Sequence, residues 1–305
     1  MSKWKVRLGL LFIAIVWAYG YIATADVLKI MNATQMQFLR FFLATIALSL
    51  IFHNKLKSIK QTTLVYGCIL GLIFFGGMTM HTAALETTTV SKNSFLVVTN
   101  VVFTPLLAFV MFRERIKRYL IPGLIIMLSG FFILVFKINF FKLSASFVQL
   151  QAETNLVLGD YLTLGSAVFF SFQIVLIGRF VRKEDPILLV ILQMGCACVL
   201  ALVYCLLSND PIPLFTMDNA LLMSNIPALL YLTFGSCVGF SLQQILQKYA
   251  SSTETALIFS TESLFATILS VLLGYEAFGS YLVIGGILIT VGIIGAETGF
   301  KFKDG

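Results

Sequence analysis

The feature that most constrains the fold is a series of long apolar runs that recurs along nearly the whole chain. A bilayer core about 30 Å thick needs about 20 apolar residues in each helix that crosses it. Ten such runs are present, at residues 8–25, 34–52, 62–81, 89–111, 119–137, 158–178, 187–207, 226–246, 254–274 and 280–297. The pattern predicts an all-α integral membrane protein with ten transmembrane helices.

Composition argues against the other broad classes. Of the 305 residues, 59% are hydrophobic and only 11% are charged, whereas a soluble domain is typically about 25% charged. The net charge of +7 does not indicate a nucleic-acid partner, because the basic residues form short clusters between the apolar runs. All five cysteines lie inside apolar runs, which is typical of small buried side chains and not of a disulfide framework.

The distribution of Lys and Arg predicts the orientation in the membrane. With the N-terminus placed in the cytoplasm, sixteen of the 21 basic residues fall on the cytoplasmic side and four on the outer side, and Arg40 lies inside a run. This bias predicts a multi-pass protein of the plasma membrane with both termini cytoplasmic. The first run followed by Ala23-Thr24-Ala25 is also similar to a signal peptide. We favour a first transmembrane helix, because cleavage would destroy the pairing of halves described next.

The two halves of the chain are related in sequence. A shift of 162 residues aligns 77–130 with 239–292 without a gap, and ten of the 54 positions are identical. The identical pairs include Gly77 and Gly239, Thr99 and Thr261, Glu114 and Glu276, and Gly130 and Gly292. Upstream, a shift of 153 residues pairs Trp17 with Phe170, Tyr19 with Phe172 and Arg40 with Gln193.

Charge indicates that these halves are inverted. The loop around Glu114 contains four basic residues between 113 and 118, whereas the equivalent loop at 274–280 contains none. Repeats of five helices each must take opposite orientations, which predicts a first repeat at 1–137, a linker at 138–157 and a second repeat at 158–305. Inverted repeats place a binding site near the membrane midplane and open it alternately to each side. A carrier needs this arrangement, whereas a receptor or scaffold does not.

Several local patterns occur together along the chain: Trp17 within 14–20, Arg40 within 38–41, the polar segment 80–96, and Pro105 followed by 112–115. The second half adds Gly159-Asp160, Gln243 to Ala250, Glu262 and Gly274-Tyr275-Glu276. In this combination the sequence resembles the EamA-type members of the drug/metabolite transporter superfamily, over essentially its whole length. Three positions depart from the family pattern: Ala18 for Gly, His81 for Gln and Ser263 for Pro. The resemblance implies a secondary active transporter, often an exporter, of a small metabolite such as an amino acid or related amphipathic compound.

Polar and ionisable groups at membrane depth are costly, so each is a candidate for the substrate path. The candidates are Trp17, Tyr19, Arg40, His81, Lys92, Asn93, Asn100, Gln173, Gln193, Gln243, Gln244 and Glu262. Glu262 could exchange a proton and couple proton movement to transport, or it could be a structural carboxyl group bonded to its neighbours. Arg40 could bind a substrate carboxylate, or it could pair with an internal acid or extend to the surface.

The remaining candidates also have two interpretations. Lys92 could line the cavity or extend to the membrane surface, and His81 could titrate at physiological pH or be an interfacial histidine. The four glutamines could line the path or join helices. Trp17 lies too deep for an interfacial belt, so it could form an aromatic cavity wall or pack against a neighbouring helix.

No cofactor is predicted. The chain has no Walker-type phosphate-binding loop, and its two histidines, His53 and His81, are too far apart in the sequence to suggest a metal site. We therefore predict a carrier and not an enzyme, with a small-molecule substrate and membrane lipid as partners and no nucleic acid. A homodimer is left open, and a lipid flippase or another non-carrier membrane protein is the alternative.

Overall fold

The computed structural model describes residues 1–136, 156–208 and 219–298, and all regular elements in these ranges are helices. They are α1 (Lys3–Val27), α2 (Ala33–Ile51), α3 (His53–Leu56), α4 (Gln61–Ala84), α5 (Val90–Val97), α6 (Asn100–Phe112), α7 (Leu120–Val135), α9 (Leu158–Phe180), α10 (Pro186–Leu207), α12 (Asn219–Gln247), α13 (Ser252–Phe259), α14 (Glu262–Leu272) and α15 (Ser280–Thr298). Most of the predicted linker, 138–155, lies outside the described residues, as do Lys137, Lys142, Lys301 and Lys303.

The all-α membrane fold predicted from the apolar runs is confirmed. Eight helical spans of the described residues are long and apolar enough to cross a membrane. Two shorter apolar helices, Leu120–Leu134 and Ser280–Ala296, correspond to the fifth and tenth runs. The ten predicted runs are thus all helical, in two sets of five.

Two of the ten runs are not single helices, which differs from the expectation. The span Val90–Phe112 is divided into α5 and α6 around Val98 and Thr99, and Ser252–Leu272 is divided into α13 and α14 around Ser260 and Thr261. Thr99 N donates to Leu96 O and Thr261 N donates to Ile258 O, three residues back in place of four. The two breaks are equivalent positions of the repeat, 162 residues apart.

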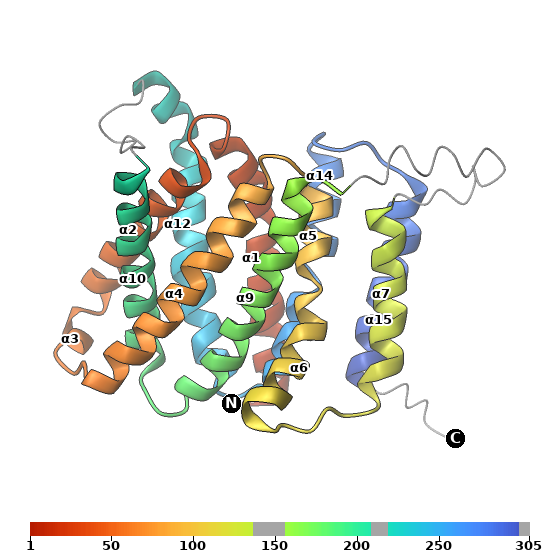
Figure 1. The fold of residues 1–305 in the computed structure, drawn as a ribbon, viewed down its shortest axis with the longest axis horizontal. Helices are drawn as coiled ribbons and strands as arrows, with labels where there is room; N and C mark the ends of the chain where they lie inside the picture. The colour runs from red at the N-terminus through yellow and green to blue at the C-terminus, as the bar shows by residue number, and fades with distance from the viewer. Residues whose placement is uncertain (137–155, 209–218, 299–305) are drawn as a thin grey trace.

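The two halves interlock. Helix α1 of the first half packs against α12, α13 and α14 of the second, and α9 of the second half packs against α4, α5 and α6 of the first. Each set of contacts is the counterpart of the other under the repeat, and Figure 1 shows α9 between α4 and α5, with α1 behind it. We call the end where α5 and α9 begin the α5 end, and the opposite end, where α1 and α13 begin, the α1 end.

The last helix of each half, α7 and α15, form a pair at one edge of the molecule (Figure 1). Their backbones approach each other at glycines that occupy equivalent positions in the two halves. A Cβ atom added to Gly123 would lie 2.1 Å from the Ala296 nitrogen, and one added to Gly130 would lie 2.7 Å from the Gly285 oxygen. Small residues therefore bring the two backbones into contact at this crossing.

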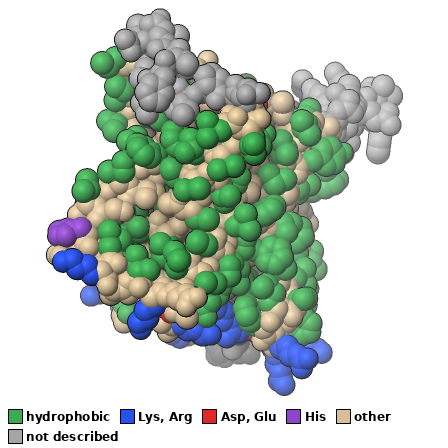
Figure 2. Space-filling view, turned by 60° about the vertical axis from the view of Figure 1, so that its left-hand side comes forward, with side chains coloured by type: hydrophobic (Ala, Val, Ile, Leu, Met, Phe, Trp, Pro, Cys, Tyr) green, Lys and Arg blue, Asp and Glu red, His purple; other side chains and the backbone are tan. Residues whose placement is uncertain are grey.

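The surface is apolar between its two ends. Figure 2 shows hydrophobic side chains over the middle of one face, with Lys and Arg gathered at the lower end. That end is the α1 end, which includes the basic residues of the α1 N-terminus and of the loops that follow α2, α6 and α9. The arrangement is typical of a helix bundle that is embedded in lipid.

Candidate functional site

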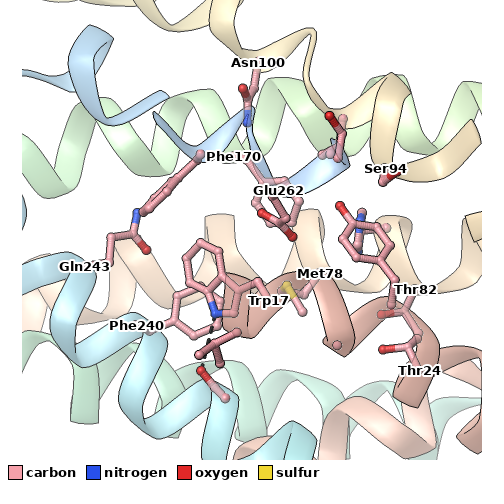
Figure 3. Close-up of a pocket in the computed structure, with 18 of the residues that line it drawn as sticks. Trp17, Thr24, Met78, Thr82, Ser94, Asn100, Phe170, Phe240, Gln243 and Glu262 are labelled. Atoms are coloured by element: carbon pink, nitrogen blue, oxygen red, sulfur yellow. Dashed lines mark hydrogen bonds between the residues drawn. The ribbon is translucent and has the colours of Figure 1, made fainter. Parts of the chain in front are cut away.

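A cavity lies between the two halves, at the level of the two helix breaks. Helices α1, α2, α4, α9 and α12 line it together with both broken helices (Figure 3). The cavity has a volume of about 100 Å³.

The two helix breaks bring an acid and an amide to the cavity. Asn100 is the first residue of α6 and Glu262 is the first residue of α14, so the repeat relates them directly. Both side chains line the cavity (Figure 3). The carboxyl group of Glu262 has the Tyr21 hydroxyl group as its polar neighbour. Among the described lining residues Glu262 is the one carboxylic acid.

A buried cation faces the same cavity from α2. Arg40 is only 7% exposed, and its Nε atom donates to Ser236 Oγ at 2.5 Å. No carboxylate of the described residues lies within 4.0 Å of its guanidinium group. The expected alternatives, an internal acid as partner or extension to the surface, therefore do not describe Arg40. A guanidinium group without an acidic partner can bind a carboxylate through two parallel hydrogen bonds.

Aromatic side chains from equivalent positions form walls of the cavity. Trp17 on α1 lies against Gly239 of α12, where an added Cβ atom would be 2.3 Å from the indole Nε1. Its repeat partner Phe170 on α9 lies against Gly77 of α4, where an added Cβ atom would be 3.1 Å from the ring. Trp17 also contacts Phe240, with ring centroids 4.7 Å apart. These rings make much of the lining apolar (Figure 3).

Several polar atoms on the lining have no hydrogen-bond partner among the described residues. They are His81 Nε2, Asn100 Oδ1, Gln173 Nε2 and Gln243 Oε1. Buried polar atoms are nearly always paired in folded proteins, so four unpaired ones around one cavity indicate that it takes up water or a polar ligand.

The structure places the twelve predicted residues in two groups. Seven of them line the cavity: Trp17, Arg40, His81, Asn100, Gln173, Gln243 and Glu262. Five do not: Tyr19, Lys92, Asn93, Gln193 and Gln244.

Four of the residues outside the cavity make structural contacts between helices. Gln244 Nε2 donates to Gln193 Oε1 at 2.9 Å and joins α12 to α10. Asn93 Nδ2 donates to Thr163 Oγ1 at 3.1 Å and joins α5 to α9. Lys92 forms an ion pair with Asp160 at 2.5 Å.

Tyr19 is 40% exposed and lies in a separate hollow near the start of α12. Its ring packs on Tyr231, with centroids 4.7 Å apart. Tyr231 lines both this hollow and the cavity, and its hydroxyl group donates to Val16 O at 2.6 Å. Tyr231 therefore stands between the cavity and the hollow at the α5 end.

Sequence reasoning missed several lining residues, among them Tyr21, Ser94, Tyr231 and Phe259. Tyr21 lies one helical turn after Trp17, so the spacing could have placed both on one face of α1. No sequence signal distinguishes Tyr231 or Phe259 from the other aromatic residues of the apolar runs.

Comparisons with known proteins agree with this architecture. Residues 4–136 and 157–297 match the model of a family described as the EamA-like transporter family. A protein of Archaeoglobus fulgidus described as an uncharacterized transporter is 24% identical over 290 residues, which cover 92% of this chain and 84% of that protein.

A solved crystal structure of a protein has the same fold. The match has a TM-score of 0.70 at 19% identity and covers 97% of this chain and 98% of the other. At that identity the match shows the fold alone.

Proposed function

We propose that this chain, which belongs to the EamA-like transporter family and is a multi-pass membrane transporter, is a secondary active carrier and not an enzyme. It works by alternating access. Its substrate is a small amphipathic metabolite with a carboxylate, such as an amino acid or a related compound. The direction is export from the cytoplasm, in line with the family resemblance. The bias of basic residues supports a plasma-membrane location with both termini cytoplasmic.

The observation that carries this proposal is the matched pair of broken helices on one cavity. Interrupted helices at equivalent positions of two inverted halves mark the substrate site of many secondary transporters. Here the breaks bring Asn100 and Glu262 to the cavity between the halves. This is the position from which a substrate can be released to either side when the halves move.

The lining supports an amphipathic substrate that carries both charges. Arg40 offers a cation without an acidic partner, and Glu262 offers a carboxyl group across the same cavity. The rings of Trp17, Phe170 and Phe240 line the same cavity and would contact an apolar side chain (Figure 3). Arg40 would bind the carboxylate of such a substrate, Glu262 would bind its amine, and the aromatic rings would contact its apolar group.

We further propose that Glu262 couples transport to protons. A partly buried carboxyl group beside a hydroxyl group can bind a proton when the cavity faces one side and release it on the other. Substrate amine and proton would then compete for the same carboxylate. Exchange of one for the other would drive export with proton entry.

The test is transport into proteoliposomes with labelled amino acids, amines and nucleosides, with and without a pH gradient. We expect saturable flux of zwitterionic, apolar amino acids that the gradient accelerates. Glu262→Gln should abolish the acceleration, and the matched control Glu184→Gln, in the α9–α10 loop, should keep it. Gradient-dependent flux that survives in Glu262→Gln would overturn the coupling role. Absence of flux for the whole panel, with folded protein, would favour a lipid substrate.

A further inference from the structure

Two ion pairs at opposite ends of the bundle are equivalent under the repeat, with their charges exchanged. At the α5 end Lys92 Nζ lies 2.5 Å from Asp160 Oδ2. At the α1 end Arg7 Nε lies 2.9 Å from Glu254 Oε1. The shift of 162 residues relates Lys92 to Glu254, and the shift of 153 residues relates Asp160 to Arg7.

Both pairs join one half of the chain to the other at the outer segment of a broken helix. Lys92 is the third residue of α5 and Glu254 is the third residue of α13. Each follows an equivalent helix cap: Thr89 Oγ1 accepts from Lys92 N, and Ser251 Oγ accepts from Glu254 N. Their partners lie near the start of α9 and of α1, the two helices that pack inside the opposite half.

The two pairs differ in burial. The side chain of Asp160 is fully buried and that of Lys92 is 16% exposed, whereas Arg7 and Glu254 are 43% and 28% exposed. Asp160 also accepts from Thr88 Oγ1 at 2.8 Å and from Val157 N at 2.9 Å. The pair at the α5 end is therefore held by more contacts and is less screened by solvent.

We infer that these two ion pairs are the alternating gates of the carrier: Lys92–Asp160 closes the cavity toward the α5 end and Arg7–Glu254 closes it toward the α1 end. The inference rests on the proposed alternating access. The breaks at 98–99 and 260–261 let α5 and α13 each tilt without α6 or α14. A tilt of α5 away from α9 opens one end and separates Lys92 from Asp160. The equivalent tilt of α13 away from α1 opens the other end and separates Arg7 from Glu254.

The two pairs lie at opposite ends of the bundle, so neither acid can pair with the base of the other end. Each end is closed by its own pair, and weakening one pair should favour opening at that end alone. The effects of two symmetric substitutions should therefore have opposite directions.

The test measures the accessibility of the cavity from each side. Ser260→Cys, at the break before α14 and on the cavity lining, is placed in a background whose five native cysteines are replaced by alanine. A membrane-impermeant maleimide is added to one side of vesicles of known orientation, and the labelling rate is measured. Lys92→Met with Asp160→Asn should raise labelling from the α5 end about tenfold, because a buried pair is lost.

The complementary variant is Arg7→Gln. It should raise labelling from the α1 end by about two- to fivefold, because this pair is more exposed. Lys55→Met is the matched control, since Lys55 also pairs with an acid of the other half, Asp185, but lies on no broken helix. It should leave both rates unchanged.

A variant with the acid and the base of the α5-end pair swapped provides a second test if the neutral double variant does not fold. Lys92→Glu with Asp160→Arg installs the α1-end pair at the α5 end and should restore the original labelling rates. Unchanged labelling in both gate variants, or a rise at the same end in both, would overturn the inference. If the labelling rates change as expected but the protein transports no amino acid, the gates are supported and the proposed substrate is wrong. Saturable transport with unshifted labelling would reject the gates alone.

Discussion

At the scale of single residues, the cavity wall depends on an aromatic ring seated against a glycine. Gly239→Ala would place a methyl group 2.3 Å from Trp17 Nε1 and force the indole to move. We expect a rise in KM of roughly fivefold, equivalent to the loss of about 1 kcal/mol of aromatic contact. In a Trp4→Phe background Trp17 is the remaining tryptophan, so a shift of its fluorescence reports the displacement.

The control for this change lies one helical turn away. Gly235→Ala would place its methyl group 3.7 Å from Val16 Cγ1, which is an ordinary contact. Its KM and fluorescence should match those of the unaltered protein. Equal effects of the two substitutions would argue that helix α12, and not the Trp17 ring, is responsible.

A carboxylate at the α1 end ties the halves in a pH-dependent way. Glu184 accepts hydrogen bonds from the hydroxyl groups of Thr62 and Thr63, each at 2.6 Å, and these bonds hold the pKa of this carboxyl group below its ordinary value of 4.5. The ionised form is therefore the one that the fold stabilises. The benefit is present above pH 4.5 and is lost as the pH falls through the lowered pKa.

Glu184→Gln should accordingly lower the thermal stability in detergent at pH 7, by about 0.5 kcal/mol for so exposed a group. The difference between the two proteins should shrink when the melting curves are repeated below pH 4. A difference that stays constant with pH would show that the hydrogen bonds stabilise the protein without favouring the ionised form.

The polar residues of the site were largely predictable, because a charged or amide group in an apolar run is visible in the sequence. Arg40 and Glu262 belong to this class, and both line the cavity. Their environments were not predictable. Arg40 donates a hydrogen bond to Ser236 of the other half. This contact depends on how α2 packs against α12, and the sequence of neither helix specifies that packing.

At the scale of the elements, the crossing of α7 and α15 tolerates no side chain at its glycines. Gly285→Ala would place a methyl group 2.3 Å from Leu134 Cγ and 2.8 Å from the Gly130 oxygen. We expect destabilisation of about 1–3 kcal/mol from overpacking, measured as a lower melting temperature. Gly286→Ala is the neighbouring control, because its methyl group would lie 3.5 Å from Leu264 Cδ2, and it should be neutral or slightly stabilising.

The ten apolar elements were predictable from hydropathy, but the two helix breaks were not. Hydropathy reports which residues prefer lipid, and residues 96–98 and 257–259, which lead up to the two breaks, are all apolar. The change lies in the hydrogen-bond pattern, where Thr99 and Thr261 each donate a hydroxyl group to a carbonyl three residues back. A side-chain bond of this kind competes with the regular helix, and its recurrence at one repeat position was the available signal.

At the scale of the whole molecule, inversion of the halves predicts that equivalent loops lie on opposite sides of the membrane. The loop after α6 and the loop after α14 correspond under the repeat, around Glu114 and Glu276. A cysteine introduced at Arg115 should react with an impermeant maleimide only from the cytoplasm, and one introduced at Phe278 only from outside. Labelling of both from the same side would contradict the inverted arrangement.

Under the proposed proton coupling, the unlike pair Asn100 and Glu262 would limit how far the carrier can work against a gradient. Two identical halves would present two acids to the cavity, whereas the described lining residues include one. One acid would exchange one proton in each cycle. A pH difference of one unit, without a membrane potential, would then support a concentration ratio of about tenfold for the substrate. Such a carrier would spend few protons per molecule and would not accumulate its substrate steeply.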